Sequence, residues 1–131
     1  MALVEWDDSF AVGNFAIDTQ HQMFISLINR IALHLERDAD KGLLEDLLRE
    51  LLKYAEFHFI SEENMMKVCG YDGTEHKKEH QNLLAGLRNR LFSLQHENID
   101  YDQLFAFLLS WFKKHTSQMD RELAQILSDR D

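Results

Sequence analysis

The stretch HFISEENMMKVCGYDGTEHKKEH, residues 58–80, contains two polar pairs at helical spacing. His58 precedes Glu62 by four positions, and His76 precedes His80 by four. Residues four apart lie on the same face of an α-helix, one turn from each other. The glycines that flank the dipeptide YD indicate a turn between the two pairs. The stretch therefore predicts two helices joined by a short loop, each with two polar side chains on one face.

Apolar residues recur every three or four positions in four segments, as they do on one face of a helix. An irregular arm precedes them, so that the predicted elements are the arm 1–17 and helices over about 18–37, 41–65, 74–95 and 101–128. Asp18 and Thr74 stand where the N-caps of the first and third helices are expected. Four helices with short connections predict an all-α fold, an up-down-up-down four-helix bundle in a single domain, 1–131.

Composition and charge exclude several kinds of partner. A formal net charge of -9 repels phosphate backbones and anionic lipid head groups, so neither nucleic acid nor a membrane surface is expected. No apolar run approaches the ~18 residues that span a bilayer, and the N-terminus lacks the pattern of a secretion signal. Cys69 is the single cysteine. We expect a half-buried loop thiol, with a redox or dimer-forming thiol as the alternative, and a cytoplasmic protein.

Polar side chains interrupt the apolar face of every predicted helix. They are His21 in the first helix, His58 and Glu62 in the second, His76 and His80 in the third, and His115 and Asp120 in the fourth. The last spacing is irregular, because a step of five residues rotates Asp120 by about 140° from His115. Asp120 reaches the same site only if its side chain bends round or the turn widens into a π-bulge.

Five imidazoles and two carboxylates in one core need an explanation. Without partners they would cost several kcal/mol per charged group, against a net stability of about 5–15 kcal/mol. Metal ions remove this cost by turning the groups into ligands. Seven side chains are too many for one tetrahedral zinc and suit two metals of higher coordination number. Nitrogen and oxygen ligands indicate iron or manganese, and so much imidazole favours iron.

The count of ligands also indicates what the metals could do. If Glu62 and Asp120 bridge both metals together with an oxo or hydroxo group, and the histidines divide as three and two, one metal has six ligands and the other five. A reduced iron with one open position can take up a small molecule such as dioxygen. The spacing of the ligands therefore indicates a di-iron centre that binds a small gas.

Four motifs in order resemble the hemerythrins, and most closely the single-domain bacteriohemerythrins. The motifs are DTQHQMF, HFISEE, HKKEH and WFKKHTSQMD, which match the H, HxxxE, HxxxH and HxxxxD signature of that family. Trp6, Val12 and Gly13, and Ile17 and Asp18 resemble its N-terminal arm. The similarity covers nearly the whole chain, although the loop before His76 lacks a proline that relatives often have.

The resemblance implies a role for each ligand. His76, His80 and His115 would hold the saturated iron, His21 and His58 the open iron, and Glu62 and Asp120 would bridge. The family binds dioxygen reversibly at the open iron. By the same match the dioxygen pocket would be lined by Phe24, Phe59, Trp111, Phe112 and Thr116. For the aromatic residues, plain core packing is the other interpretation, and both can hold.

Thr116 stands where the family usually has an aliphatic residue. Its hydroxyl could hold a water or hand a proton to the bound ligand, which would shorten the lifetime of the oxygenated form. It could instead bond back to the carbonyl of Phe112, as helical threonine often does. The sequence leaves both open. His34 and His96 lie near helix ends with no carboxylate at ligand spacing, and we expect them outside the site.

The leading functional hypothesis is a non-enzymatic dioxygen-binding protein that acts as carrier, store or local supplier. A di-iron oxidase or a reductase of peroxide or nitric oxide is the second, although such enzymes use mostly carboxylates. An oxygen or iron sensor is the third, and it normally needs a signalling segment that four helices leave no room for. We expect a monomer whose ligand is dioxygen, with transient contact to an oxygen-consuming enzyme as a further partner.

Overall fold

The structure is a computed structural model of the chain, and it describes residues 4–36, 40–97, 99–117 and 119–130. In this part of the chain all regular elements are helical. A short 3-10 helix, η1 (Asp8–Phe10), is followed by α1 (Phe15–Glu36), α2 (Lys41–Cys69), α3 (Thr74–His96), α4 (Tyr101–Ser117) and α5 (Met119–Arg130).

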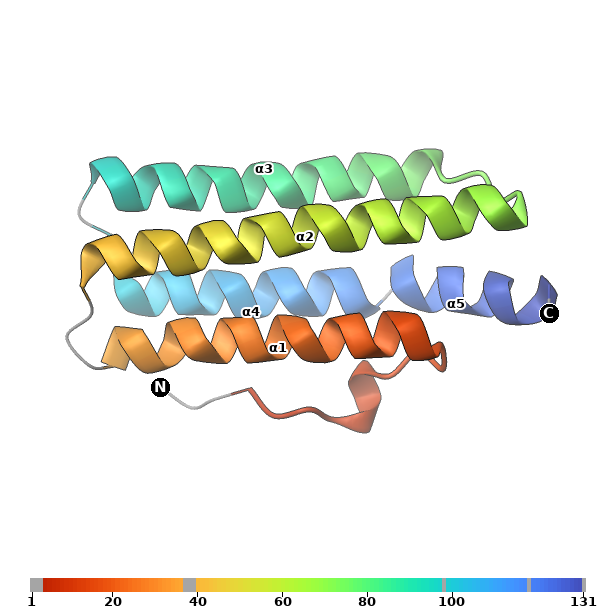
Figure 1. Cartoon of the computed structure of the whole chain (residues 1–131), viewed down its shortest axis with the longest axis horizontal. Helices are drawn as coiled ribbons and strands as arrows, with labels where there is room; N and C mark the ends of the chain where they lie inside the picture. The colour runs from red at the N-terminus through yellow and green to blue at the C-terminus, as the bar shows by residue number, and fades with distance from the viewer. Residues whose placement is uncertain (1–3, 37–39, 98, 118, 131) are drawn as a thin grey trace.

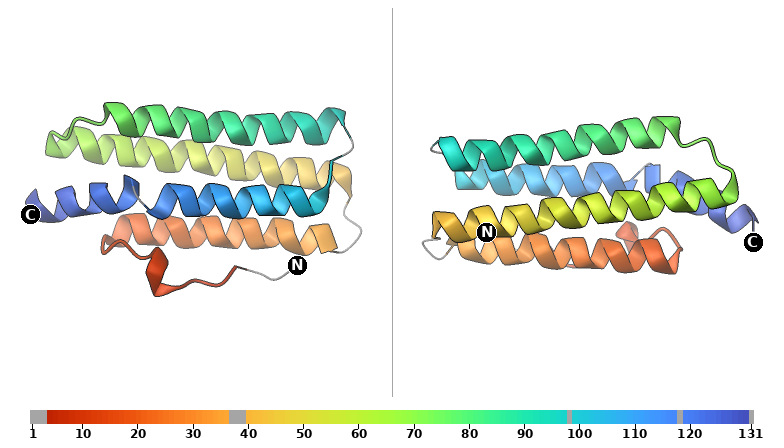
Figure 2. Two further views of the ribbon diagram at one scale, coloured as in Figure 1. Left: turned by 180° about the vertical axis from the view of Figure 1, so that it is seen from behind. Right: turned by 45° about the horizontal axis from the view of Figure 1, so that its top comes forward.

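The helices α1 to α4 run alternately in opposite directions, and α5 continues beyond the end of α4 (Figure 1). α1 packs on α2 and α4, and α2 packs on α3, so that the four helices enclose one long core. The other views show the same arrangement (Figure 2). The prediction of an all-α, up-down-up-down four-helix bundle is confirmed. No helix of the described segments combines the length and apolar character needed to cross a membrane.

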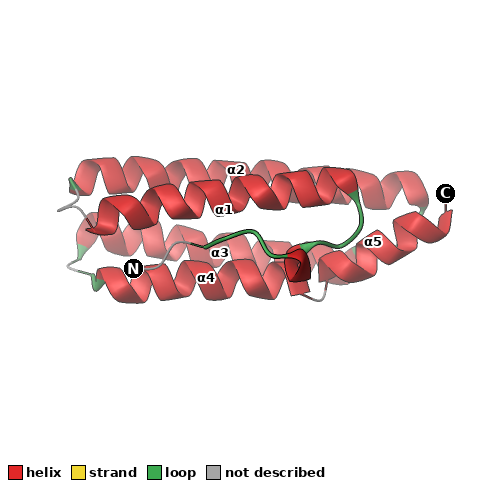
Figure 3. Ribbon diagram, turned by 90° about the horizontal axis from the view of Figure 1, so that it is seen from below, coloured by secondary structure: helices red, strands yellow, loops and turns green. Residues whose placement is uncertain are grey.

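The N-terminal arm lies along α1 and α4 (Figure 3). The backbone N–H and carbonyl of Val4 both pair with the side-chain amide of Asn29 on α1, at 2.7 Å each. The ring of Phe10 meets the ring of Phe112 on α4 edge to face, with centroids 5.4 Å apart. The arm therefore covers the seam between α1 and α4, close to predicted pocket residue Phe112.

The start of α1 differs from the prediction. α1 begins at Phe15, and Asn14 is its capping residue, because Asn14 Oδ1 accepts the N–H of Ile17. Asp18 lies in the first turn and is not the N-cap. Its carboxylate instead accepts the N–H groups of Val12 and Gly13 at 2.8 and 3.2 Å. Asp18 therefore ties the arm to α1.

The turn between α2 and α3 brings the two halves of the opening stretch together. Gly70 closes α2 in the left-handed conformation, with φ 72°, and the carbonyl of Met66 accepts the N–H of Tyr71. Thr74 is the first residue of α3 and not its cap. Asp72 accepts both its N–H and its hydroxyl. Cys69 is half-buried as expected, but it ends α2 and does not lie in a loop.

The segment predicted as one helix over 101–128 is described as α4 and α5, with residue 118 outside the described residues. The axis of α5 is tilted away from that of α4 (Figure 3). A small apolar cluster at α5 is separate from the main core of the bundle. It consists of Ile17, Met66, Leu123 and Ala124. The polar residues predicted on the inner faces of the helices lie between these two apolar regions. The apolar side chains on either side keep bulk water away from these polar residues.

Candidate metal centre

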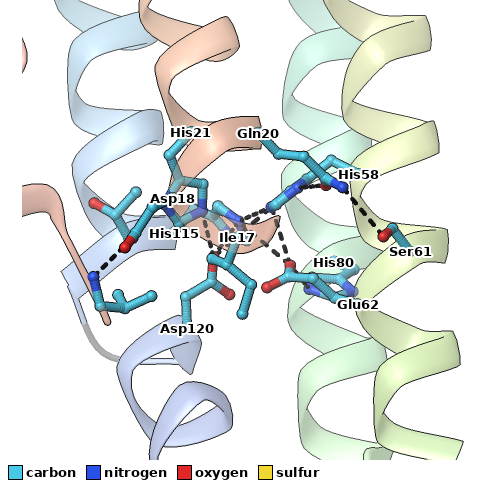
Figure 4. A network of polar contacts seen from close by, with 12 residues as sticks. Ile17, Asp18, Gln20, His21, His58, Ser61, Glu62, His80, His115 and Asp120 are labelled. Carbon is cyan, nitrogen blue, oxygen red and sulfur yellow. Dashed lines mark hydrogen bonds and ion pairs between the residues drawn. The ribbon is translucent and has the colours of Figure 1, made fainter. Parts of the chain in front are cut away.

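Six of the seven predicted ligands come together in the core of the bundle (Figure 4). Each of the five α-helices contributes at least one side chain, and each of these side chains is at most 2% exposed. They are His21 from α1, His58 and Glu62 from α2, His80 from α3, His115 from α4 and Asp120 from α5. The cluster thus joins residues up to 99 positions apart in the sequence.

Asp120 contacts histidines of three helices. Its Oδ2 lies 2.6 Å from His21 Nε2 and 2.8 Å from His115 Nε2. The same oxygen lies 3.7 Å from His58 Nε2. The irregular spacing of five residues therefore does not keep Asp120 from the site, because the carboxylate comes from the first turn of a separate, tilted helix.

Glu62 occupies the opposite side of the cluster. Its Oε1 lies 3.2 Å from His58 Nε2, 3.3 Å from His80 Nε2 and 3.5 Å from His115 Nε2. The Nε2 atoms of His58 and His115 are 2.8 Å apart. Two nitrogen atoms this close need either a proton or a cation between them. The Nε2 atoms and carboxylate oxygens therefore converge on one small volume.

Among the described residues, the cluster divides into two groups whose ligand atoms lie within 4.8 Å of one another. One group is His21, His58, His115 and Asp120, and the other is Glu62, His80, His115 and Asp120. Ligand atoms at about 2.1 Å from one metal, in octahedral geometry, lie about 3 Å from each other. The contacts of 2.6–3.7 Å match that spacing. Two overlapping groups fit two neighbouring metal ions. Asp120 and His115 belong to both groups, whereas Glu62 belongs to one.

His76, the seventh predicted ligand, belongs to neither group. It is buried on α3, one turn before His80, and the centroids of the two rings are 6.2 Å apart. Its Nδ1 lies 3.2 Å from Tyr71 Oη. His76 therefore lies at the edge of the cluster, on the side of His80.

The protonation of the cluster follows from its burial. Burial raises the pKa of Glu62 well above its usual range, and the neighbouring carboxyl group of Asp120 adds to this effect. Burial also opposes ionisation of Asp120, but the electrostatic influence of His115, with the adjacent Glu62 and His21, outweighs it and holds the pKa of Asp120 well below its usual range. Burial lowers the pKa of His115 to about 4. Burial therefore favours the neutral form of Glu62 and of His115, whereas the neighbours of Asp120 favour its carboxylate.

Several buried polar atoms of the cluster lack a hydrogen-bond partner in the described part of the chain. They are His21 Nδ1, both carboxyl oxygens of Glu62, His80 Nε2 and Asp120 Oδ1. Buried polar groups in proteins are almost always paired, so a group of this kind at one place requires a reason. Carboxylate oxygens and imidazole nitrogens are ligands of iron and manganese. The residues present therefore fit a pair of such ions.

Polar side chains around the cluster hold the outer nitrogens of three histidines. Gln20 Oε1 lies 2.5 Å from His58 Nδ1, and Glu63 Oε2 lies 3.3 Å from His80 Nδ1. Tyr71 plays the same part for His76. Such outer partners orient metal-bound histidines and set their tautomer. The sequence analysis missed Gln20, Glu63 and Tyr71, although each stands near a ligand in the chain.

The aromatic residues predicted to line a pocket are all buried against the ligands. Phe59 stacks on His80, with ring centroids 4.1 Å apart and an angle of 9°. Phe24 meets His58 edge to face at 5.1 Å, and Phe112 meets His21 at 5.9 Å. The Trp111 indole N–H donates to the carbonyl of Leu83 on α3, at 2.9 Å. These rings pack the core and also form an apolar wall beside the cluster.

The hydroxyl of Thr116 bonds back into its own helix. Its Oγ1 donates to the carbonyls of Phe112, at 3.1 Å, and Lys113, at 3.3 Å. A hydroxyl engaged in this way has no free proton to give to a ligand. His34 and His96 lie away from the cluster as expected, the first half-buried in the last turn of α1 and the second exposed beside Phe92.

The comparisons with known proteins agree with this geometry. Residues 12–127 match the family described as hemerythrin HHE cation binding domain. A bacteriohemerythrin of Clostridium acetobutylicum is 32% identical over 127 residues, covering 89% of this chain and 95% of that protein. Myohemerythrin of Riftia pachyptila is 31% identical over 116 residues, covering 88% and 86%.

A crystal structure of a hemerythrin mutant has a TM-score of 0.84 and 25% identity to this chain, and the match covers 98% of this chain and 99% of that one. The family match spans most of the sequence, and it includes every residue of the cluster. Fold, cluster and sequence therefore lead to one conclusion: the chain belongs to the hemerythrin family.

Proposed function

We propose that the protein binds dioxygen reversibly at a non-haem di-iron centre and acts as an oxygen carrier, store or local supplier. The observation that carries this proposal is the buried cluster of two overlapping ligand groups, in which imidazole ligands outnumber carboxylates. Bacteriohemerythrin and myohemerythrin relatives support it.

The ligand roles in this proposal follow the family pattern. His21 and His58 would hold the iron with the open position, and His76, His80 and His115 would hold the other. Glu62 and Asp120 would bridge them, with an oxo or hydroxo group as the third bridge. The contact of His21 with Asp120 at 2.6 Å and of His80 with Glu62 at 3.3 Å supports this division. When bound, the two irons would supply the electrons that dioxygen needs in order to bind.

The surroundings of the cluster favour binding over turnover. In the proposal Phe24, Phe59, Trp111 and Phe112 line the dioxygen pocket and keep water out, and Thr116 completes its wall. Apolar walls slow the release of the bound ligand as an anion, because an anion that separates from the metal is poorly solvated in an apolar pocket. Neutral imidazole ligands also stabilise high oxidation states of the metals less than a shell of anionic carboxylates would. They therefore favour the reduced metals.

An oxygen electrode separates the carrier from an oxidase. Reduced, iron-loaded protein should take up about one dioxygen per pair of irons and then stop, even with an electron donor present. Dioxygen should return to solution when its pressure is lowered. Continuous consumption in proportion to the added donor would instead assign the protein to the oxidases or reductases.

The proposal includes three further expectations for the whole chain. It forms one hemerythrin-like domain over residues 1–131, it is a cytoplasmic monomer, and it delivers dioxygen through transient contact with an oxygen-consuming enzyme. The high negative charge of the chain supports the monomer, because copies of it repel one another. Sedimentation at several salt concentrations tests this expectation, and a salt-dependent dimer would contradict it.

A further inference from the structure

Gln20 is the only side chain drawn in Figure 4 that links α1 to α2 just outside the cluster. Its Oε1 lies 2.5 Å from His58 Nδ1, and its Nε2 donates to Ser61 Oγ at 3.3 Å. The backbone carbonyl of Gln20 also accepts the hydroxyl of Tyr54, at 2.9 Å. Three contacts thus fix one residue of α1 against three residues of α2.

The amide of Gln20 sets the tautomer of His58. Its Nε2–H group is directed to Ser61, so its Oε1 is the atom that faces His58. An amide oxygen only accepts, and His58 Nδ1 must therefore carry the proton. The proton on Nδ1 leaves a lone pair on His58 Nε2, which lies 3.2 Å from Glu62 Oε1 inside the cluster. His58 is thereby prepared as an Nε2 ligand before any metal arrives.

Gln20 also connects two ligands of the same predicted metal. It directly precedes His21, whose Nε2 enters the cluster 2.6 Å from Asp120. Gln20, which contacts α2, and the ligand His21 are therefore consecutive residues of α1. His80 and His76, on α3, depend on other partners, Glu63 and Tyr71. Loss of the Gln20 contacts should disturb the His21 and His58 side of the cluster and leave the α3 side in place.

We propose that Gln20 is a positioning residue that holds His58 as a neutral Nε2 ligand and sets the spacing of α1 and α2 at the metal bound by His21 and His58. The inference rests on the di-iron centre proposed above. Loss of an outer partner typically weakens metal binding about 10–100-fold. The effect should fall on one of the two metals, because only one ligand set depends on Gln20.

The test is an anaerobic titration of the full-length apoprotein with Fe²⁺ against a competing chelator. Wild type should bind two ions per chain. Gln20→Leu should bind one with wild-type affinity and the second at least about tenfold more weakly. Gln20→Glu keeps an acceptor oxygen for His58 Nδ1 and should restore most of the second affinity. Ser61→Ala, which removes only the outer anchor of the amide, should have a smaller effect than Gln20→Leu.

The control is Gln22→Leu, at an exposed position of the same helix, which should bind two ions as wild type does. Circular dichroism of each variant shows whether the helices are intact. The inference is overturned if Gln20→Leu binds both ions with wild-type affinity, if it loses both ions equally, or if Gln20→Glu loses as much as Gln20→Leu. A wild-type protein that binds fewer than two ions would reject the di-iron proposal itself.

Discussion

Removal of the metal should destabilise the fold by an amount that the structure allows one to work out. Four buried atoms that face the cluster have no hydrogen-bond partner in the described residues: both oxygens of Glu62, His80 Nε2 and Asp120 Oδ1. Each such group costs about 1–3 kcal/mol. Because water can enter a metal-free cluster, we take the lower end, about 4 kcal/mol in total. For a domain of this size that corresponds to a fall of roughly 12–20 °C in melting temperature.

Glu62→Gln shows whether this stabilisation acts through the cluster. The raised pKa of Glu62 means that burial favours the neutral acid form of its carboxyl group in the chain alone. Glutamine has the same shape and charge as that acid, so the metal-free variant should melt within about 5 °C of the metal-free wild type. It lacks the anionic ligand, however, and should lose more than half of the gain in melting temperature on metal binding.

The assay is thermal unfolding by circular dichroism of the metal-loaded and chelator-treated proteins, kept reduced and anaerobic. Glu50→Gln serves as the matched control, because Glu50 forms an exposed ion pair with Arg30 on the surface. It should keep the full metal-dependent gain. Equal melting of wild type with and without metal would refute the reasoning, since the buried polar atoms would then cost nothing.

Three other perturbations give separate expectations. Phe59→Ala should destabilise the protein by about 3–5 kcal/mol in urea unfolding, because it removes a fully buried ring stacked on His80; a loss below about 1 kcal/mol would contradict this packing. Thr116→Val should change the autoxidation rate by no more than about twofold, because the Thr116 hydroxyl already donates to the carbonyl of Phe112. A tenfold slowing, about 1.4 kcal/mol in the barrier, would instead show that this hydroxyl is a proton donor. Burial raises the pKa of Tyr54 to about 12. The stability that this phenol supplies should thus be complete below pH 10 and decline as the pH rises toward 12, and Tyr54→Phe should lack that decline in urea unfolding of the apoprotein between pH 9 and 11.

The ligands could be found from the sequence because their positions follow the helical period. His21 and His58 lie on the same faces as the apolar residues that fill the core, so the pattern that predicts a bundle also predicts that these polar groups are inside it. Asp120 was harder, because a spacing of five residues does not fit one regular helix. In the structure His115 and Asp120 lie on two separate helices, α4 and α5. No local helix propensity in WFKKHTSQMD indicates this division.

The supporting residues could not be found in this way. Gln20 and Glu63 are partly exposed, and such positions usually carry polar residues for solubility alone. Only the distance between neighbouring helices shows that one reaches His58 and the other His80. The caps show the same limit. Asn14 and Asp18 are both good capping residues, and the contacts of the arm decide which of them caps α1 and which holds Val12 and Gly13.

The central claim, reversible binding of dioxygen at a buried di-iron centre, is tested most directly by optical spectra through repeated cycles of oxygenation. Reduced protein with two irons per chain should gain a visible absorption band on exposure to dioxygen. The band should disappear when the gas is removed and return at the same intensity on the next exposure, without added reductant. A band that never forms, or a first exposure that leaves the protein oxidised and unresponsive to removal of the gas, would contradict the claim.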